Sequence, residues 1–193
     1  MSQFPEHWWA EVVDPLKPDW EIFPAEVRPP SVILSKRNEL GLLSNLAPTP
    51  FEMDGDSFAS VEALWQMTKF PDPDDPADPR HQFEWPTDRT TLRKLSGLES
   101  KRLGDLASQR MREHGWSWVS YKGQRWEYPE KGRGPFYELI HRAMLLKLEQ
   151  NPAVRDVLEQ TRGLVLKPDH VQLGTLSPAH LYHEIWMEIR DGQ

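Results

Sequence analysis

SVEALWQMTKF, residues 60–70, is the stretch from which the rest of the chain can be interpreted. Ser60 is a typical N-cap residue, so the pattern predicts a helix that begins after it and ends near Phe70. One side of this helix carries polar and aromatic side chains at the spacing i, i+3, i+4 and i+7, namely Glu62, Trp65, Gln66 and Lys69. That spacing normally marks an apolar face packed on the core. The polar stripe therefore needs a separate explanation.

The same helix also has an apolar face. It consists of Ala63, Met67 and Phe70 at i, i+4 and i+7, with Val61 and Leu64 beside them. Since this face can pack on the core, the Glu62 side is available for water or for a pocket. A fully exposed Trp65 would leave a large apolar surface in water, which favours the pocket. Small-molecule sites combine an aromatic wall with a few polar groups, so we expect this stripe to line a ligand site.

Glu62 falls in the first turn of the predicted helix. The helix dipole favours an ionised carboxylate there by about 0.3–1 kcal/mol. An ionised carboxylate can act as a base toward water or stabilise a developing cation. The alternative is a surface glutamate that serves only the electrostatics of the first turn.

Length and composition indicate one substantial domain. The chain has 193 residues, with nine Trp and seven Phe that can bury large apolar areas. Cysteine is absent, which excludes disulfides and thiolate metal sites and fits a reducing compartment. No apolar run approaches the roughly 18–20 residues of a membrane span, and the N-terminus lacks a signal-peptide core. The expected location is therefore cytoplasmic, with no membrane partner.

The formal net charge of −7 argues against an extensive non-specific nucleic-acid surface, because such binding needs many clustered cations. A small site for one anionic ligand remains compatible with this charge.

Turn chemistry and periodicity predict a mainly α protein with two or three short β hairpins. Residues 1–30 combine many prolines with three tryptophans, which indicates an extended arm packed on the body through its indoles. Hairpins are expected at 51–58 around Asp54-Gly55 and at 116–128 around Lys122-Gly123. Short strands are expected near 31–36 and 164–166, a solvated loop at 71–87, and helices within 88–111, 136–150, 152–158 and 177–190.

Residues 43–70 also resemble the signature of the NADAR, or YbiA-like, family of N-glycosidases. The matching positions are Leu43-Ser44-Asn45, Pro50-Phe51, Asp54-Gly55, Ser60, Glu62, Gln66 and Lys69. Two later stretches are similar to further blocks of the family, AMLLKLEQNPAVRDVL at 143–158 and WMEIR at 186–190. The three blocks occur in the order of the family and span about residues 33–190.

This resemblance implies a single-domain YbiA-like helical fold over residues 31–191, with an inserted loop near 71–87 and an inserted hairpin near 116–134. It implies hydrolysis of a ribose–nucleobase N-glycosidic bond in an ADP-ribosyl or ribosyl-phosphate substrate, such as ADP-ribosylated guanine or an intermediate of riboflavin synthesis. The substrate would be a small molecule or attached to nucleic acid. Glu62 matches the essential glutamate of the family, and Asn45, Gln66 and Lys69 match neighbouring polar positions.

The chain departs from the family at several positions. Ala63 replaces a histidine, Leu166 replaces a glutamate and Leu173 replaces a tryptophan, while Asp169 matches an aspartate only if one residue is deleted. These differences leave open a non-catalytic module that binds ADP-ribose or a related nucleotide without turnover. A protein-interaction partner that retains only the fold is a third reading.

The expected chemistry assigns tasks to the remaining candidates. Cleavage of a ribose–nitrogen bond passes through an oxocarbenium-like state, which a Glu62 carboxylate could stabilise while it deprotonates water. A protonated Asp169 or the amide of Asn45 could assist the departing base, and the sequence does not choose between them. Trp65 and Trp126 are candidates to stack on the base, although Trp126 could equally pack on the body. Lys69 could contact a phosphate or pair with a nearby acid.

No cofactor and no metal are expected. His170, His180 and His183 lie near one another in sequence, but H-E-x-x-H is absent, as are the phosphate-binding and nucleophile-elbow motifs.

Overall fold

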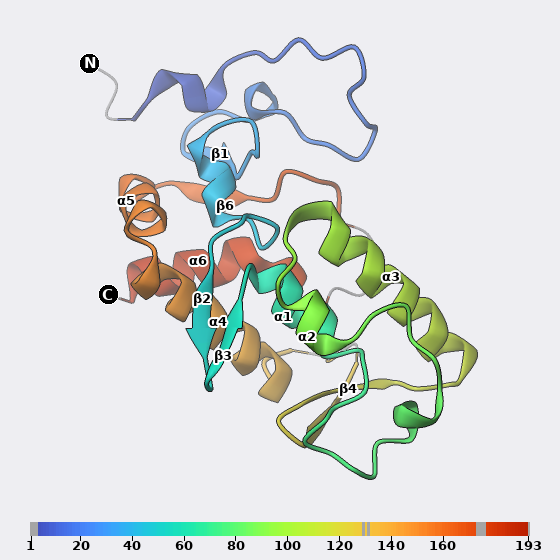
Figure 1. The fold of residues 1–193 in the computed structure, drawn as a ribbon. Coiled ribbons are helices and arrows are strands. Elements are labelled where there is room, and N and C mark those ends of the chain that lie inside the picture. The colour runs from blue at the N-terminus through green and yellow to red at the C-terminus, as the bar shows by residue number, and fades with distance from the viewer. Residues whose placement is uncertain (1–3, 129, 131, 173–176, 193) are drawn as a thin grey trace.

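The computed structural model describes residues 4–128, 130, 132–172 and 177–192. Within these residues the fold is mainly α with small sheets (Figure 1). The α helices are α1 (Val61–Met67), α2 (Arg89–Leu92), α3 (Gly97–Glu113), α4 (Pro135–Gln150), α5 (Pro152–Gln160) and α6 (Tyr182–Asp191). The strands are β1 (Ser31–Ile33), β2 (Phe51–Met53), β3 (Asp56–Phe58), β4 (Trp118–Tyr121), β5 (Gln124–Glu127) and β6 (Val165–Lys167). Short 3₁₀ turns occupy Glu6–Trp9, Pro24–Glu26, Glu39–Leu43, Pro79–Gln82 and Pro178–Leu181.

The short helix α1 lies at the centre of the molecule (Figure 1). As predicted, Ser60 caps it, with its hydroxyl accepting from the Ala63 amide at 3.1 Å. The helix packs against α3 and α4, and every one of its residues is buried. The Glu62 side therefore does not face open water. This burial means that its polar groups must find partners within the protein or line a cavity.

Both predicted hairpins are confirmed. Phe51 pairs with Phe58 across β2 and β3, and Asp54 and Gly55 have φ values of 52° and 81° in the turn between them. Two consecutive positive φ values define the turn that matches the twist of a two-residue hairpin. The β4–β5 hairpin repeats this geometry at Lys122 and Gly123.

The strands near 31 and 165 form a parallel pair, which the sequence did not indicate. Val32 lies opposite Leu166, and both side chains are fully buried. Parallel neighbours need a crossover connection rather than a tight turn, so no local signal announces them. The pair joins the N-terminal and C-terminal parts of the chain (Figure 1).

Two tryptophans attach the N-terminal segment to the body. The Trp8 indole donates to Glu39 Oε1 at 2.6 Å, and the Trp9 indole donates to the Ser31 carbonyl at 2.8 Å. Trp20 is 49% exposed, with the Lys36 ammonium over its ring. Residues 20–22 also hydrogen-bond to residues 169–171.

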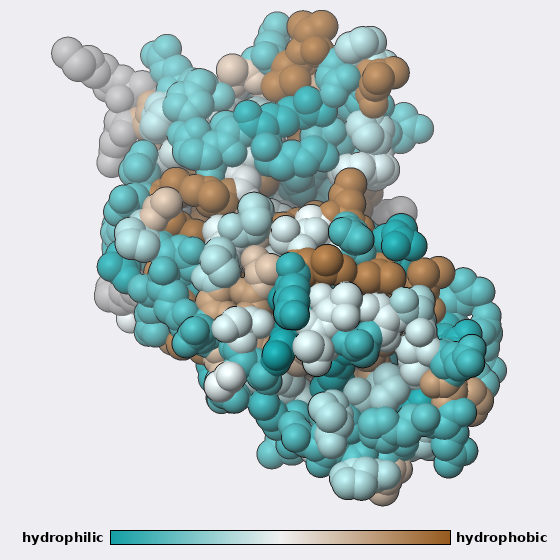
Figure 2. Space-filling view, viewed as in Figure 1, coloured by the Kyte–Doolittle hydropathy of each residue, from teal (hydrophilic) through white to brown (hydrophobic). Residues whose placement is uncertain are grey.

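Figure 2 shows hydrophobic surface over the N-terminal segment at the top of the view, where Val13 and Leu16 are 96% and 85% exposed. A second band of hydrophobic surface crosses the middle of this face, with hydrophilic surface around it.

The expectation of a solvated loop at 71–87 is wrong in part. Arg80 is fully buried and pairs with Asp78 at 2.8 Å. Its guanidinium also donates to the Ser120 hydroxyl and to the Thr68 carbonyl at the end of α1. The loop is thus tied to the central helix by a buried ion pair.

None of the helices in the described residues is both long enough and apolar enough to cross a membrane.

Candidate active site

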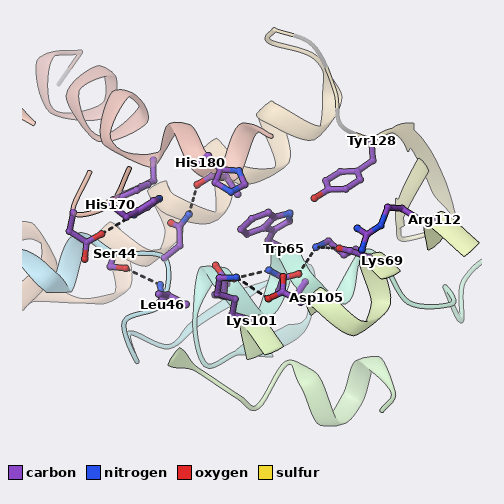
Figure 3. A pocket seen from close by; sticks show the side chains of 17 residues that line it. Ser44, Leu46, Trp65, Lys69, Lys101, Asp105, Arg112, Tyr128, His170 and His180 are labelled. Atoms are coloured by element: carbon purple, nitrogen blue, oxygen red, sulfur yellow. Dashed lines mark hydrogen bonds and ion pairs between the residues drawn. The ribbon is translucent and has the colours of Figure 1, made fainter. Parts of the chain in front are cut away.

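A cavity of about 260 Å³ lies beside α1 (Figure 3). Its wall combines α1, one face of α3, Tyr128 just after β5, Asp169 and His170, and residues next to the start of α6. The lining residues are Ser44, Asn45, Leu46, Glu62, Trp65, Gln66, Lys69, Lys101, Asp105, Ser108, Arg112, Tyr128, Asp169, His170, Ala179, His180 and Tyr182. The structure therefore brings together the predicted residues Asn45, Glu62, Trp65, Gln66, Lys69 and Asp169.

Three polar side chains of α1 form a chain of hydrogen bonds along the cavity wall. The Lys69 ammonium donates to Gln66 Oε1 at 2.7 Å, and Gln66 Nε2 donates to Glu62 Oε1 at 2.7 Å. Lys69 thereby fixes the orientation of the Gln66 amide, which in turn fixes one oxygen of Glu62. No described residue donates to Glu62 Oε2, so this oxygen is available to a ligand or a water.

Gly104 on α3 provides the space for this chain. A Cβ atom at position 104 would lie 1.7 Å from Gln66 Oε1, far inside van der Waals contact. Only glycine lets α3 approach α1 closely enough to enclose the amide. Gly104 is buried on the side of α3 that faces α1, whereas Leu106, two residues later, is 41% exposed.

The pKa of Glu62 is shifted in the direction opposite to the first-turn expectation. Burial raises the pKa of this carboxyl, and the raising effect outweighs the hydrogen bond from Gln66 and the nearby charge of Lys69. Glu62 is only 3% exposed, so the loss of hydration is nearly complete. The result is a more basic carboxylate than one on a surface helix.

Lys69 is buried as well, and burial lowers the pKa of its ammonium to about 8. Besides Gln66, it donates to the Ser108 hydroxyl at 2.8 Å and lies 3.4 Å from the Gly104 carbonyl. An ammonium has three donors, and these acceptors occupy them. Of the two roles considered for Lys69, the geometry favours the internal one over a direct phosphate contact.

Asn45 presents an acceptor to the cavity. Its Nδ2 donates to the Ala179 carbonyl at 2.9 Å, which fixes the orientation of the amide. Its Oδ1 is buried and has no hydrogen-bond partner among the described residues. This free acceptor suits a sugar hydroxyl. The amide nitrogen carries a second N–H, so donation to a departing base stays a prediction.

The backbone of residues 43–45 is fixed by hydrogen bonds to three consecutive carbonyls. The Trp186 indole donates to the Leu43 carbonyl at 2.6 Å, and the Lys147 ammonium donates to the Ser44 carbonyl at 2.7 Å. The amide of Glu62 donates to the Asn45 carbonyl at 2.9 Å. This part of the wall is held by α1, α4 and α6 together.

Aromatic rings form much of the remaining wall. Figure 3 shows Trp65 in the middle of the site, with His180 on one side and Tyr128 on the other. The Trp65 and His180 rings meet edge to face, with centroids 5.1 Å apart. Burial, together with the nearby charge of Glu62, raises the pKa of the Tyr128 hydroxyl to about 12, which keeps it a neutral donor.

Figure 3 shows His170 at the opposite end of the site from Tyr128, and Asp169 pairs with His170. Asp169 Oδ1 is 2.9 Å from His170 Nδ1, so the carboxyl and the imidazole form a pair. The carbonyl of Asp169 accepts from the Ile22 amide at 2.8 Å. The N-terminal segment therefore supports the backbone that carries this pair.

Trp126 does not line this cavity. It packs on Phe136 with ring centroids 6.5 Å apart and lines a separate surface hollow with Asp54, Tyr121 and Arg142. Of the two readings considered for this residue, the structure supports packing on the body. Tyr128, two residues later, occupies the place expected for Trp126. Leu173 lies outside the described residues.

Helix α3 contributes residues to the cavity that the sequence pattern did not single out. Lys101, Asp105, Ser108 and Arg112 follow one another at i, i+4, i+7 and i+11 and form a polar stripe beside the buried one. The spacing was visible, but it is also the spacing of a solvated helix face. Lys101 and Asp105 form an ion pair at 2.9 Å on the cavity rim.

The described residues contain no group of three or more His, Asp or Glu side chains arranged to hold a metal ion.

The arrangement combines a buried base, a free amide acceptor, aromatic walls and cationic groups at the rim. Such a site suits a ligand with a sugar between an aromatic ring and an anionic group.

Comparisons with known proteins give little further guidance. No protein-family model matches the chain, and no curated protein matches it. Among solved structures, the NMR structure of the E. coli protein YbiA is similar, with a TM-score of 0.49, 19% sequence identity and coverage of 86% of each chain. A likeness at this level carries no argument about activity.

Proposed function

We propose that the protein is an N-glycosidase that hydrolyses the bond between a ribose and a nucleobase in an ADP-ribosyl or ribosyl-phosphate substrate. The observation that carries this proposal is the buried Glu62 carboxylate, held at one oxygen by Gln66 and open at the other, in the wall of a cavity that suits a sugar. The resemblance of residues 43–70 to the NADAR signature supports it independently.

Glu62 has the properties of a general base. Burial raises the pKa of the carboxyl, which makes the ionised form a stronger base toward water than a surface carboxylate. In the proposed step, Glu62 Oε2 takes a proton from water while the water oxygen bonds to the anomeric carbon. The same negative charge stabilises the positive charge that develops on the sugar.

The bond between the anomeric carbon and the base nitrogen breaks with its electron pair moving to the nitrogen. This nitrogen needs a proton or a hydrogen bond as it leaves. We assign this task to the pair formed by His170 and Asp169, with the imidazole as donor and Asp169 as the residue that orients it. The products are a sugar with a free anomeric hydroxyl and the released base.

The remaining wall would hold the substrate in place. Asn45 Oδ1 accepts from a ribose hydroxyl, and Trp65 offers an aromatic surface. Lys101 and Arg112 carry the positive charge that an anionic group requires. Lys69 acts through Gln66 rather than on the ligand.

A non-catalytic nucleotide-binding module is the second candidate. One observation favours it: Leu166, which stands where the family has a glutamate, is fully buried in β6 and provides no carboxylate to the cavity. A site that lacks this second acid could bind a nucleotide without turning it over.

The test is incubation of the full chain with ADP-ribosylated guanine, ADP-ribosylated DNA, NAD and intermediates of riboflavin synthesis, followed by mass spectrometry. The proposal requires release of a base or a free sugar from at least one of them, abolished in Glu62→Gln. Binding without release from any of these compounds would favour the second candidate. Absence of both binding and release would reject both candidates.

A further inference from the structure

A second cavity of about 430 Å³ adjoins the first. It is lined by Ser108, Met111, Arg112, Gly115, Trp116, Ser117 and Tyr128. Ser108, Arg112 and Tyr128 line both cavities, so the two lie next to each other along the C-terminal half of α3. Nothing in the proposed reaction at Glu62 uses this second space.

The wall of the second cavity is mostly apolar, and its Trp116 ring packs against other rings. Trp116 stacks with His114 at a centroid distance of 4.7 Å and with Trp85 at 6.1 Å. Phe83 meets the same indole edge to face at 5.2 Å. The Met111 side chain is buried beside it. A wall fixed in this way loses little side-chain entropy when a flat ring packs against it.

The residues shared by the two cavities include polar and charged side chains. Arg112 is exposed, with no hydrogen-bond or ion-pair partner among the described residues. The Ser108 hydroxyl already accepts from Lys69 and donates to the Gly104 carbonyl. The free charge among the residues shared by the two cavities is therefore the Arg112 guanidinium, a group whose geometry matches phosphate oxygens.

The first cavity, at about 260 Å³, is smaller than the roughly 300–1,000 Å³ common for ligand pockets. It can enclose a ribose with one attached group but leaves little room for a larger nucleotide. Any additional part of the substrate must extend beyond this cavity, and the second cavity adjoins it at Arg112.

We infer that the second cavity is a binding site for a second aromatic base, joined through phosphate to the sugar held at Glu62, with Arg112 at the phosphate. This inference rests on the proposed function and narrows it to substrates with two bases. Two kinds of ligand supply a second base joined to the sugar through phosphate: a pyrophosphate-linked dinucleotide, and a nucleic-acid strand through its next nucleotide.

The test measures dissociation constants for AMP, NAD and the phosphodiester dinucleotide ApA by calorimetry on the full chain. Ser117→Phe fills the second cavity from an exposed position whose side chain makes no hydrogen bond among the described residues. Ser117→Ala is the matched control, and thermal melting verifies that both variants fold.

We expect at least one two-base probe to bind the wild type tenfold or more tightly than AMP. Ser117→Phe should remove this gain and leave AMP within about twofold, while Ser117→Ala changes neither. A gain for NAD alone assigns the site to a pyrophosphate-linked ligand, and a gain for ApA alone assigns it to a strand.

Equal affinities for the three probes in the wild type would overturn the inference, as would an equal loss of AMP and two-base binding in Ser117→Phe. If AMP binds and the second base adds nothing, the proposed function survives. If no probe binds, AMP included, the proposed function fails as well.

Discussion

Gln66 and Glu62, one turn apart on α1, are joined by a 2.7 Å hydrogen bond from the amide to one carboxylate oxygen. The bond lies inside the protein, where its strength is not reduced by competition with water. Because it engages only Oε1, it orients the carboxylate without consuming its second oxygen. The consequences of this arrangement can be measured.

The first prediction concerns Glu62 itself. Glu62→Gln retains the shape of the side chain but removes the base, so hydrolysis should fall by at least about a hundredfold. Ligand binding should stay within about tenfold, since the loss is confined to the transition state. Calorimetry and turnover on the same substrate give both numbers. Equal turnover by the two proteins would reject Glu62 as the base.

The second prediction concerns Gly104. Replacing an exposed glycine in a helix interior by alanine usually stabilises the folded protein by about 0.5–1 kcal/mol. Here the added Cβ would collide with Gln66 Oε1, so Gly104→Ala should lower the free energy of unfolding and reduce turnover at least tenfold. Chemical denaturation and kinetics measure the two effects.

A double-mutant cycle isolates the cause of this effect. Gln66→Ala removes the atoms that the new Cβ would meet, so Gly104→Ala should become neutral or stabilising in that background. If the substitution remains as destabilising without Gln66, the contact between the two residues is not responsible.

The third prediction concerns the titration of Glu62. The charges of Lys69 and Lys101 lower its pKa, Lys69 more strongly, and Asp105 raises it. The pKa should therefore rise in Lys69→Met, rise less in Lys101→Met, and fall in Asp105→Asn. Carbon NMR of the labelled Glu62 carboxyl reads the pKa directly.

The acid limb of kcat/KM should move in the same order, because turnover requires the ionised form. A shift of the same sign in the Lys69 and Asp105 variants would contradict the assigned electrostatics.

Local signals explain why much of the fold could be predicted. The Asp54-Gly55 and Lys122-Gly123 turns require positive φ values, and these residues supply them within a few positions. The Ser60 cap is equally local. The pairing of β1 with β6 is not, because it depends on segments that only the complete fold brings together. The burial of Arg80 has the same origin, since its partner Ser120 belongs to β4.

The site residues also fall into two groups, one that local periodicity identifies and one that only the packing of the helices identifies. Glu62, Trp65, Gln66 and Lys69 share one short helix, so their periodicity was enough to identify them as a group. The polar stripe of α3 has equal periodicity, but only its packing against α1 distinguishes it from a solvated face. Trp126 failed as a candidate because β5 ends at Glu127, and the residue that reaches the cavity is Tyr128, beyond the strand.

The fourth prediction concerns Arg112 at the cavity rim. Arg112→Gln should weaken the binding of ribose 5-phosphate about tenfold at low salt and leave unphosphorylated ribose unchanged, because the lost interaction is with the phosphate. Arg102→Gln removes the same charge from an α3 position that does not line the cavity, and it should have little effect. Equal losses in the two variants would indicate a general charge effect, which added salt would screen.

The fifth prediction concerns Lys147, which is fully buried against the Ser44 carbonyl. Burial lowers the pKa of its ammonium from 10.5 to about 7, so between these values the unfolded chain binds a proton that the folded chain does not. The free energy of unfolding should therefore rise with pH across this window, because unfolding is accompanied by proton uptake. The Lys147 contribution between pH 7 and 9.5 should be on the order of 3 kcal/mol.

Other groups also titrate in this range, so the informative quantity is the difference between wild type and Lys147→Met in denaturant unfolding at each pH. Relative to the wild type, Lys147→Met should lose most of this rise, whereas Lys94→Met, at an exposed position, should retain it. Loss of the Ser44 contact lowers the free energy of unfolding of Lys147→Met by a similar amount at every pH. It therefore does not account for a difference in slope between the two proteins. Parallel pH profiles for wild type and Lys147→Met would show that the ammonium is not perturbed by burial, and the support it gives to the Ser44–Asn45 wall would then come at no cost to the folded state.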